Sequence, residues 1–248
     1  MPHPFASVVL DEVGSTNTEA LRRAAAGETG PLWILARRQT QGRGRSGRVW
    51  TSEPGNLHAS LLTRLACPPA AVQQISLIAG VAAFDAIRAA AGGRLAGLRL
   101  KWPNDVLIGT AKCAGILAES IAGTREITAV IGIGINLAWS PADLGRAATH
   151  LAAHGVDTTP EATLLRLDEA MQRWLGVWQA GAGFAAVRSA WRERGGPAGE
   201  AIRFDTGRER IEGTFVDLDA DGALILRDAR GAERTLNFGD VTLTQESG

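Results

Sequence analysis

The sequence predicts an α+β protein with a large helix-and-strand domain, followed by a small domain built of strands alone. Up to position 194, stretches with apolar residues every three or four positions alternate with short apolar runs, which are typical of helices and of strands respectively. Gly195-Gly196-Pro197 then has the composition of a linker. After it, short alternating segments are separated by turn residues, a pattern that favours a small barrel-like module.

The first helix is expected at 16–26, directly after a short strand at 8–10. Thr16 and Glu19 have the spacing of a capping box, in which the threonine side chain caps the helix. A long helix at 70–91 carries apolar residues at three- and four-residue spacing, as a buried helix does. The other expected strands of this domain are 32–36, 57–65, 98–101, 106–108, 115–121 and 127–135, and its other helices are 161–179 and 184–193.

In the small domain, Asp- and Gly-containing turns mark the points where the chain reverses. The expected strands are 201–205, 210–217, 223–227 and 233–237, with turns at 219–222 and 228–231. The two expected domains are therefore 1–196 and 197–248.

Bulk composition indicates a soluble globular protein. The 248-residue chain is 45% hydrophobic and 21% charged, and its formal net charge is zero. It has no uninterrupted apolar run of the length that a membrane span requires, and two cysteines, Cys67 and Cys113, are too few for a disulfide or zinc framework. A nucleic-acid-binding protein would be expected to carry an excess of basic residues. We therefore expect a cytoplasmic protein that binds neither a membrane nor DNA.

Only two of the 26 basic residues are lysines, Lys101 and Lys112. Arginine can replace lysine on a solvated surface, but not where a compact point charge must lie close to a substrate atom. The clustering of the two lysines indicates chemistry in the segments 101–105 and 112–117. The alternative is that two lysines remain there by chance.

The segment 42–47, Gly-Arg-Gly-Arg-Ser-Gly, matches the G-x-G-x-x-G pattern of dinucleotide-binding proteins and of protein kinases. Its context excludes both classes, because a strand rather than a helix follows, no acidic residue comes at the distance needed to bind a ribose, and no D-F-G motif is present. Arg43, Arg45 and Arg48 nevertheless alternate with glycines. Because guanidinium groups bind phosphate oxygens, we expect this loop to close over an anionic, nucleotide-derived ligand; the alternative is a solvated flexible loop.

Five short segments, taken in order, are similar to those of a known family. They are Ser15-Thr16-Asn17, 41–50, 101–105, Lys112 with 115–117, and 132–136. As an ordered set they resemble the biotin protein ligases (biotin–[acetyl-CoA carboxylase] ligases), and the resemblance covers essentially the whole chain. It implies a mixed central sheet flanked by helices, of the class II aminoacyl-tRNA synthetase/biotin ligase type, with a small C-terminal SH3-like β-barrel domain.

The resemblance implies a reaction in two steps. Biotin and MgATP give biotinyl-5′-AMP and pyrophosphate, and a lysine of the biotin carboxyl carrier protein then attacks the mixed anhydride to form an amide. Since adenylation supplies the leaving group, no cysteine or serine nucleophile is needed. Attack of one anion on another depends on positioning and positive charge, which the arginines and lysines of these segments can supply. ATP, Mg²⁺ and biotin are the expected cofactor and substrates.

The resemblance also implies roles for individual residues. The catalytic residues are Lys112, Arg45, Arg48, Lys101 and Asp105. The biotin-binding residues are Ser15, Thr16, Asn17, Gln41, Arg43, Gly44, Arg45, Trp50, Lys112 and Gly115. The residues for ATP and the adenylate are Arg45, Arg48, Trp50, Lys101, Asn104, Asp105, Gly134 and Asn136. Asn104 and Asp105 would serve the nucleotide and its metal or help to activate the acceptor lysine, and no separate metal site of the protein is expected.

Two departures from the family matter. Its C-terminal module often ends in Gly-Glu, apolar, Ser, apolar, Arg, whereas positions 239–244 are Gly-Asp-Val-Thr-Leu-Thr. Because this arginine is missing, we expect no contact between the small domain and the nucleotide through a side chain at that position. Some members carry an N-terminal DNA-binding domain that has no counterpart here, so we expect no repressor activity. Family members often form homodimers, which makes a homodimer a further expectation.

Other interpretations stay open at this point. A lipoate–protein ligase or octanoyl transferase shares the catalytic architecture, and a binding module for biotin or a nucleotide would not turn over. The complete loop and both lysines favour the biotin ligase. The segment 132–136, Gly-Ile-Gly-Ile-Asn, also has the pattern of a buried strand whose glycines let a helix pack closely.

Overall fold

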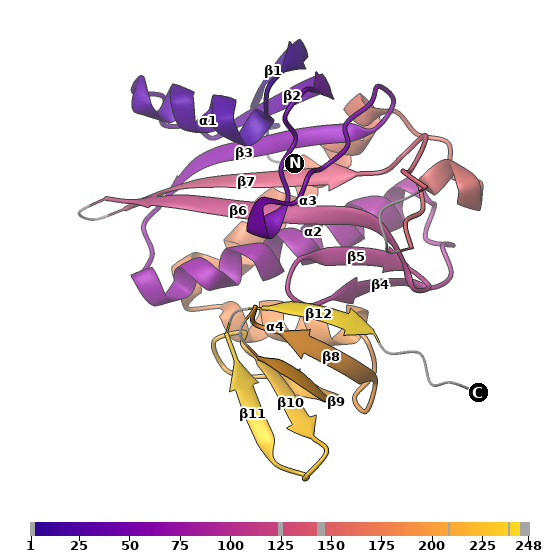
Figure 1. Ribbon diagram of the computed structural model, residues 1–248. Helices are drawn as coiled ribbons and strands as arrows, with labels where there is room; N and C mark the ends of the chain where they lie inside the picture. Colours follow the sequence, from indigo (N-terminus) through magenta and orange to yellow (C-terminus); the bar gives the residue numbers. More distant parts are fainter. Residues whose placement is uncertain (1–2, 124–125, 143–146, 208, 238, 244–248) are drawn as a thin grey trace.

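Two β-sheets organise the chain, one of seven strands and one of five (Figure 1). The computed structural model describes residues 3–123, 126–142, 147–207, 209–237 and 239–243. The larger sheet contains β1 (Ala6–Val13), β2 (Leu32–Gln39), β3 (Leu57–Leu65), β4 (Leu98–Lys101), β5 (Asp105–Ile108), β6 (Ala111–Ala122) and β7 (Ile127–Ile135). Its strands lie in the order β1-β2-β3-β7-β6-β5-β4, with β1 and β2 parallel and the other pairs antiparallel. The predicted mixed central sheet is confirmed.

Helices cover both faces of this sheet, because successive side chains of its strands alternate between two hydrophobic clusters. The helices are α1 (Thr16–Ala25), α2 (Gln74–Ala90), α3 (Pro160–Trp178) and α4 (Phe184–Arg194). Leu62 and Val130 pack with Ala20 of α1, whereas Leu61 and Ile131 belong to the larger cluster that includes α2 and α3. The cavity described below lies on the α1 side of the sheet.

The segment Ala70–Ala90, which runs through a 3₁₀ turn into α2, is long and apolar enough to cross a membrane by length and composition. The sequence shows no uninterrupted apolar run here because Ser76 and Asp85 interrupt it. In the folded chain 78% of its most apolar window is buried. That burial is typical of a core helix.

The smaller sheet is antiparallel throughout. Its strands are β8 (Ala201–Asp205), β9 (Arg210–Leu218), β10 (Leu224–Asp228), β11 (Glu233–Leu236) and β12 (Asp240–Leu243), in the order β11-β10-β9-β8-β12. The sequence did not predict β12, which pairs with β8. Within the described residues β11 and β12 are not paired with each other, so the SH3-like barrel stays a prediction.

Aromatic side chains join the two sheets. Trp102, in the β4–β5 hairpin, lies with its ring centroid 5.8 Å from that of Phe204, and its Nε1 donates to Gly222 O at 3.0 Å. The ring centroid of Trp191 in α4 lies 6.2 Å from that of Phe215. One hydrophobic core therefore continues from the large sheet into the small one. This packing holds the small sheet beside the hairpin that carries the first lysine.

Candidate active site

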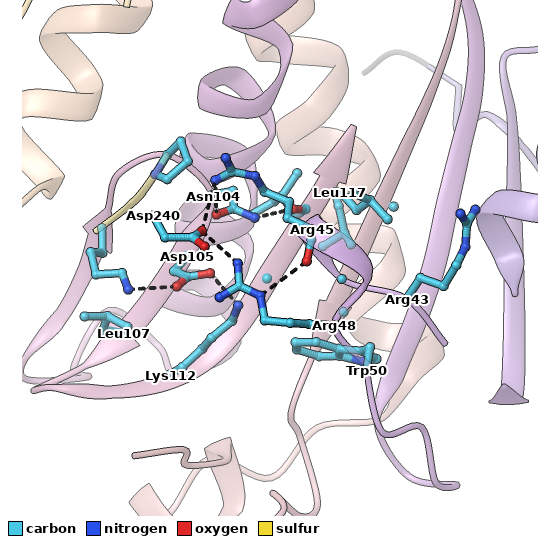
Figure 2. Close-up of a pocket in the computed structure, with 18 of the residues that line it drawn as sticks. Arg43, Arg45, Arg48, Trp50, Asn104, Asp105, Leu107, Lys112, Leu117 and Asp240 are labelled. Carbon is cyan, nitrogen blue, oxygen red and sulfur yellow. Dashed lines mark hydrogen bonds and ion pairs between the residues drawn. The ribbon is translucent and has the colours of Figure 1, made fainter. Parts of the chain in front are cut away.

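A cavity of about 360 Å³ lies where the large sheet, the glycine–arginine loop (residues 42–49) and β12 meet (Figure 2). Its volume is in the usual range for small-molecule sites. The predicted site residues that line it are Ser15, Thr16, Asn17, Arg43, Gly44, Arg45, Arg48, Trp50, Lys101, Asn104, Asp105, Lys112, Gly115 and Gly134. Gln41 and Asn136 are not part of this lining. The cavity thus brings together segments that are far apart in the sequence.

Glycines of β7 form part of the cavity floor because a larger side chain would have no room. A Cβ added at Gly134 would lie 2.5 Å from ring atoms of Trp50, and one at Gly132 would lie 2.3 Å from Asn17 Oδ1. The isoleucines between and beside these glycines point into the core on the opposite face. The glycine therefore leaves room for a helix at Gly132, where Asn17 of α1 approaches. At Gly134 the neighbour is the indole of Trp50 instead.

Hydrogen-bonding groups line the end of the cavity at α1. The main-chain N–H and the hydroxyl of Thr16 both donate to Gln39 Oε1, at 2.8 and 3.1 Å. The Ser60 hydroxyl lies 2.8 Å from Thr16 Oγ1 and 2.6 Å from Asn17 Oδ1, so these three side chains form one buried network. The side chains of this network are neutral donors and acceptors, and the charged pair of Arg43 and Glu119 lies beside it, with Asn17 Nδ2 donating to Glu119 Oε2 at 2.7 Å.

The predicted capping box does not form. Ser15 is the N-cap residue of α1 and makes no side-chain capping bond, while Thr16 is already helical and bonds to Gln39. Glu19 instead pairs with Arg22 and Arg23, each at 2.8 Å. The first turn of α1 is therefore held by the neighbouring strand β2, not by its own side chains.

Gln39, not Gln41, supplies the glutamine side chain of the cavity. Gln39 Nε2 donates to Ser52 Oγ at 2.8 Å, which leaves its Oε1 directed at Thr16. Gln41 is exposed and lies outside the lining. Two glutamines stand two positions apart in the sequence, and only the course of the chain at the end of β2 distinguishes them.

The β4–β5–β6 meander brings both lysines to one carboxylate. Lys101 and Asp105 pair across the β4–β5 hairpin, and Lys112 lies near the start of β6. Lys101 Nζ is 3.0 Å from Asp105 Oδ2, and Lys112 Nζ donates to Asp105 Oδ1. A Cβ added at Gly115 would lie 2.8 Å from Lys112 Nζ, so the glycine leaves room for the ammonium group.

Asp105 is ionised throughout the physiological pH range. Burial raises the pKa of this carboxyl, but the charges of Lys112 and Lys101 outweigh it and bring the pKa from 3.8 down to about 2. Because the pKa is lower in the folded chain than in the unfolded one, the charge stabilises the fold above about pH 4, and this contribution is lost as the pH falls toward 2. Two ammonium groups face one carboxylate, which leaves an excess of positive charge.

The glycine–arginine loop is a short hairpin over the cavity. Trp50 N donates to Gly42 O at 2.9 Å, and Gly44 N donates to Arg48 O at 2.7 Å. A Cβ at Gly42 would lie only 2.3 Å from Trp50 O, whereas at Gly44 the nearest atom is 3.5 Å away. Gly42 is thus needed to close the hairpin, and Gly44 faces the cavity.

The three loop arginines diverge from this hairpin (Figure 2). Arg45 Nη1 donates to Asn104 Oδ1 at 3.3 Å, and burial lowers the pKa of the Arg45 guanidinium. Arg48 Nη2 donates to Asp240 Oδ1 at 2.7 Å. Arg43 extends the other way, toward α1. Two guanidinium groups therefore lie on the same side of the cavity as the lysines.

Trp50 separates the main cavity from a small one of about 20 Å³. Lys112 Nζ lies 5.5 Å from its ring centroid, a cation–π distance. The buried indole N–H has no hydrogen-bond partner among the described residues. Asn136 lines the small cavity and donates to Thr149 O at 3.0 Å. It lies behind the indole and has a structural partner.

The C-terminal strand β12 contributes to the cavity, which the sequence did not predict. Asp240, Val241, Thr242 and Leu243 all belong to the lining. Lys101 Nζ donates to Val241 O at 2.9 Å. The strand is too short to be recognised from alternation, and its position depends on pairing with β8. Thr244, the last residue of the departing motif, lies outside the described residues.

Two sequence families match the chain. The model of the Biotin/lipoate A/B protein ligase family matches residues 11–136, and that of the Biotin protein ligase C terminal domain matches residues 198–243. These ranges contain, respectively, the cavity segments of the large sheet up to β7 and the strands of the small sheet.

Individual proteins are similar over nearly the whole chain. The biotin–[acetyl-CoA-carboxylase] ligase of Paracoccus denitrificans is 40% identical over 91% of this chain and 95% of its own length. The enzyme of the same name from Mycobacterium tuberculosis is 33% identical over 94% of this chain and 87% of its own length. Among solved structures, the biotin protein ligase from Aquifex aeolicus in complex with biotin and ATP has a TM-score of 0.79 and 26% identity, covering 97% of this chain and 99% of that one.

Proposed function

The chain belongs to the biotin/lipoate A/B protein ligase family, and within it we propose that the chain is a biotin–[acetyl-CoA-carboxylase] ligase. It joins biotin to a lysine of a biotin carboxyl carrier protein, using ATP and passing through biotinyl-5′-AMP. One observation carries this proposal: Lys101 and Lys112 lie beside Arg45 and Arg48 in a cavity whose other end is lined by the neutral, hydrogen-bonding side chains of Thr16, Asn17 and Gln39.

The two ends of the cavity suit the two parts of the adenylate. A ureido ring both donates and accepts hydrogen bonds, as do the side chains at the α1 end. We assign the ring to Ser15, Thr16, Asn17 and Gln39, with Gln39 taking the role predicted for Gln41. The nucleotide then extends toward the cationic end. There we assign it to Arg45, Arg48, Lys101, Asn104 and Asp105, with Trp50 and Gly134 beneath.

In the first step, the biotin carboxylate attacks the α-phosphorus of ATP and pyrophosphate leaves. Both reactants are anions, so fixed cations must hold them together and stabilise the charge that develops between them. Lys112 has the compact charge that this task requires, and Gly115 leaves it space at the junction of the two ends. Lys101 and the two arginines would contact the phosphates.

In the second step, the acceptor lysine attacks the acyl carbon and AMP leaves. The attacking amine must be neutral and must lose a proton as the amide forms. With a pKa of about 2, Asp105 is a weak proton acceptor. We therefore assign Asp105 to holding Lys101 and Lys112 in place, and not to removing this proton.

Mg²⁺ is proposed as part of the substrate, bound to the triphosphate of ATP. Magnesium prefers oxygen ligands and is commonly held by substrate phosphates together with one or two carboxylates. In the parts of the chain that the structure describes, no group of three or more His, Cys, Asp or Glu side chains could hold a metal ion. Asn104 and Asp105 are the residues whose side-chain oxygens would hold the ion together with the phosphates.

The molecule as a whole carries further proposals. We propose a catalytic domain at 1–196 and a C-terminal domain at 197–248 with an SH3-like barrel, supported by the linker at 195–197 and the separate antiparallel sheet. The composition supports a cytoplasmic enzyme that acts without DNA. A homodimer is proposed from the family resemblance.

Substituting Gly134 with alanine is expected to displace the Trp50 indole and weaken nucleotide binding. Overpacking costs about 1–3 kcal/mol of folding free energy, and an indole that moves into the cavity relieves it at the expense of the ligand. We therefore expect the Kd for ATP to rise about ten-fold. Isothermal titration calorimetry would measure it. Gly176→Ala is the matched control, because Gly176 lies on α3 with open space where its Cβ would be. A Gly134→Ala protein with the Kd of the control would contradict the close packing of Trp50 on the floor.

Pyrophosphate release tests the proposed function directly. The purified chain is incubated with MgATP and either biotin, lipoate or neither acid, and pyrophosphate is measured. We expect pyrophosphate release with MgATP and biotin but not with lipoate or without an acid. Amide formation should follow when a biotin carboxyl carrier domain is added. Release with lipoate in place of biotin would identify a lipoate ligase, and binding of biotin without release would identify a non-catalytic module. Either result would overturn the proposal.

A further inference from the structure

Carboxylates outside the glycine–arginine loop hold it on two sides. Arg43 lies 3.4 Å from Glu119 of β6, whereas Arg48 lies 2.7 Å from Asp240 of β12. Arg45 Nη1 is 3.9 Å from the same Asp240 carboxylate. The first contact stays within the large sheet, but the second crosses to the small one. The positions of Arg45 and Arg48 therefore depend on the C-terminal strand.

Gly239 and the first two residues of β12, Asp240 and Val241, each bind one cation of the cavity, and Figure 2 shows Asp240 beside Arg48. The pairs are Arg45 Nη2 with Gly239 O at 3.1 Å, Arg48 Nη2 with Asp240 Oδ1 at 2.7 Å, and Lys101 Nζ with Val241 O at 2.9 Å. The strand is itself fixed by pairing with β8 along its length. A paired strand, rather than a loose chain end, thus presents these acceptors to the cavity.

Charge explains why a carboxylate is needed between the two arginines. Arg45 and Arg48 repel each other, and Arg45 is also desolvated by burial; both effects lower its pKa, whereas Asp240 raises it. By offsetting this repulsion, Asp240 lets both guanidinium groups occupy the same side of the cavity. The cations there still outnumber the carboxylates. The residues are Arg45, Arg48, Lys101 and Lys112, against Asp105 and Asp240. A polyphosphate would therefore still be attracted.

We propose that Asp240 is a positioning residue of the adenylation site, which orients Arg45 and Arg48 over the phosphates without contacting the ligand. This proposal rests on the proposed biotin ligase function. The small domain then acts on the nucleotide through the loop. It needs no arginine of its own at position 244, where the sequence has threonine.

The test compares variants in biotin-dependent pyrophosphate release. Asp240→Asn keeps the shape of the side chain and removes its charge. The KM for ATP should rise about five-fold, close to the upper limit for an exposed ion pair, with kcat changed less than about two-fold. Asp240→Glu should return the KM to within about two-fold of the wild-type value. The Tm should change little, because both partners are partly exposed.

Asp217→Asn is the matched control. Asp217 is also a carboxylate of the small sheet that pairs with two arginines, Arg188 at 3.0 Å and Arg192 at 2.9 Å, but it does not line the cavity. This variant should keep the wild-type KM for ATP. A wild-type KM in Asp240→Asn, or an equal rise in Asp217→Asn, would refute the positioning role.

An error in the proposed function can be told apart from an error in the role of Asp240, because it affects the wild-type chain as well. If the wild-type chain releases no pyrophosphate with biotin, the ligase proposal is wrong whatever the variants do. Calorimetric titration with ATP alone then still tests Asp240, because it measures binding apart from turnover. Asp240→Asn should bind ATP about five-fold more weakly than Asp217→Asn, and equal affinities would overturn the proposal.

Discussion

Replacing Lys112 with alanine is expected to slow formation of biotinyl-5′-AMP by about 100- to 1,000-fold, the loss seen when one preorganised charge-stabilising donor is removed from an active site. The Lys112 side chain is only 12% exposed, and its ammonium group lies at the junction of the two ends of the cavity. Water cannot replace it efficiently there, because the transition state gathers charge from two anions. Single-turnover pyrophosphate release at saturating biotin and ATP measures this step.

Stability should change far less than rate in this variant. Asp105 keeps Lys101 as a partner at 3.0 Å, so its buried carboxylate is not left alone. Thermal unfolding followed by circular dichroism provides the comparison. Lys112→Arg tests the requirement for a compact charge, and it should also be slow because a planar guanidinium does not fit the space beside Gly115. A Lys112→Ala protein with a normal rate of adenylation would remove Lys112 from the mechanism.

Replacing Arg45 with alanine is expected to accelerate escape of the adenylate by about 10- to 100-fold, the value of one or two charge-assisted hydrogen bonds. Arg45 is more buried than Arg48, with 17% of its side chain exposed against 45%. The loop should then close less tightly over the phosphate of the intermediate. Escaped adenylate reacts with any accessible amine, so labelling of a bystander protein without a carrier domain reports it.

Arg22→Ala is a suitable control for this experiment. Arg22 is an exposed arginine on α1 whose partner is Glu19, and it does not line the cavity. It should leave bystander labelling at the wild-type level. If Arg45→Ala retained the adenylate as firmly as the control, at equal rates of adenylation, the loop would not be what holds the intermediate.

Much of the fold follows from local sequence patterns. Strands β3, β4, β7 and β8 begin and end at the residues that the sequence predicts. Turn-forming or charged residues flank several of their ends, such as Asn56 before β3 and Asn136 after β7. The helix predicted at 70–91 instead begins with a 3₁₀ turn at Pro69–Gln73, and α2 starts at Gln74. Apolar periodicity is nearly the same in both structures, so it cannot separate them.

The candidate site was predictable where unusual residue types are close in sequence. Lysines in an arginine-rich chain and glycines that alternate with arginines are visible without a structure, and they line one cavity. Gln39 and Asp240 were missed for a different reason. Their roles depend on tertiary contacts, and the pair Arg48–Asp240 spans 192 positions of the chain. Local periodicity carries no information about such pairs.

The contacts of Asp105 affect the chemical reactivity of the protein surface. This carboxylate holds both lysines of the chain inside the cavity, so no other part of the molecule carries an ε-amine. The electrophile that such an enzyme makes therefore meets no lysine on the outside of the molecule that made it. The same feature means that lysine-directed reagents, which usually modify a protein at many scattered sites, would here act as probes of whether the cavity is occupied.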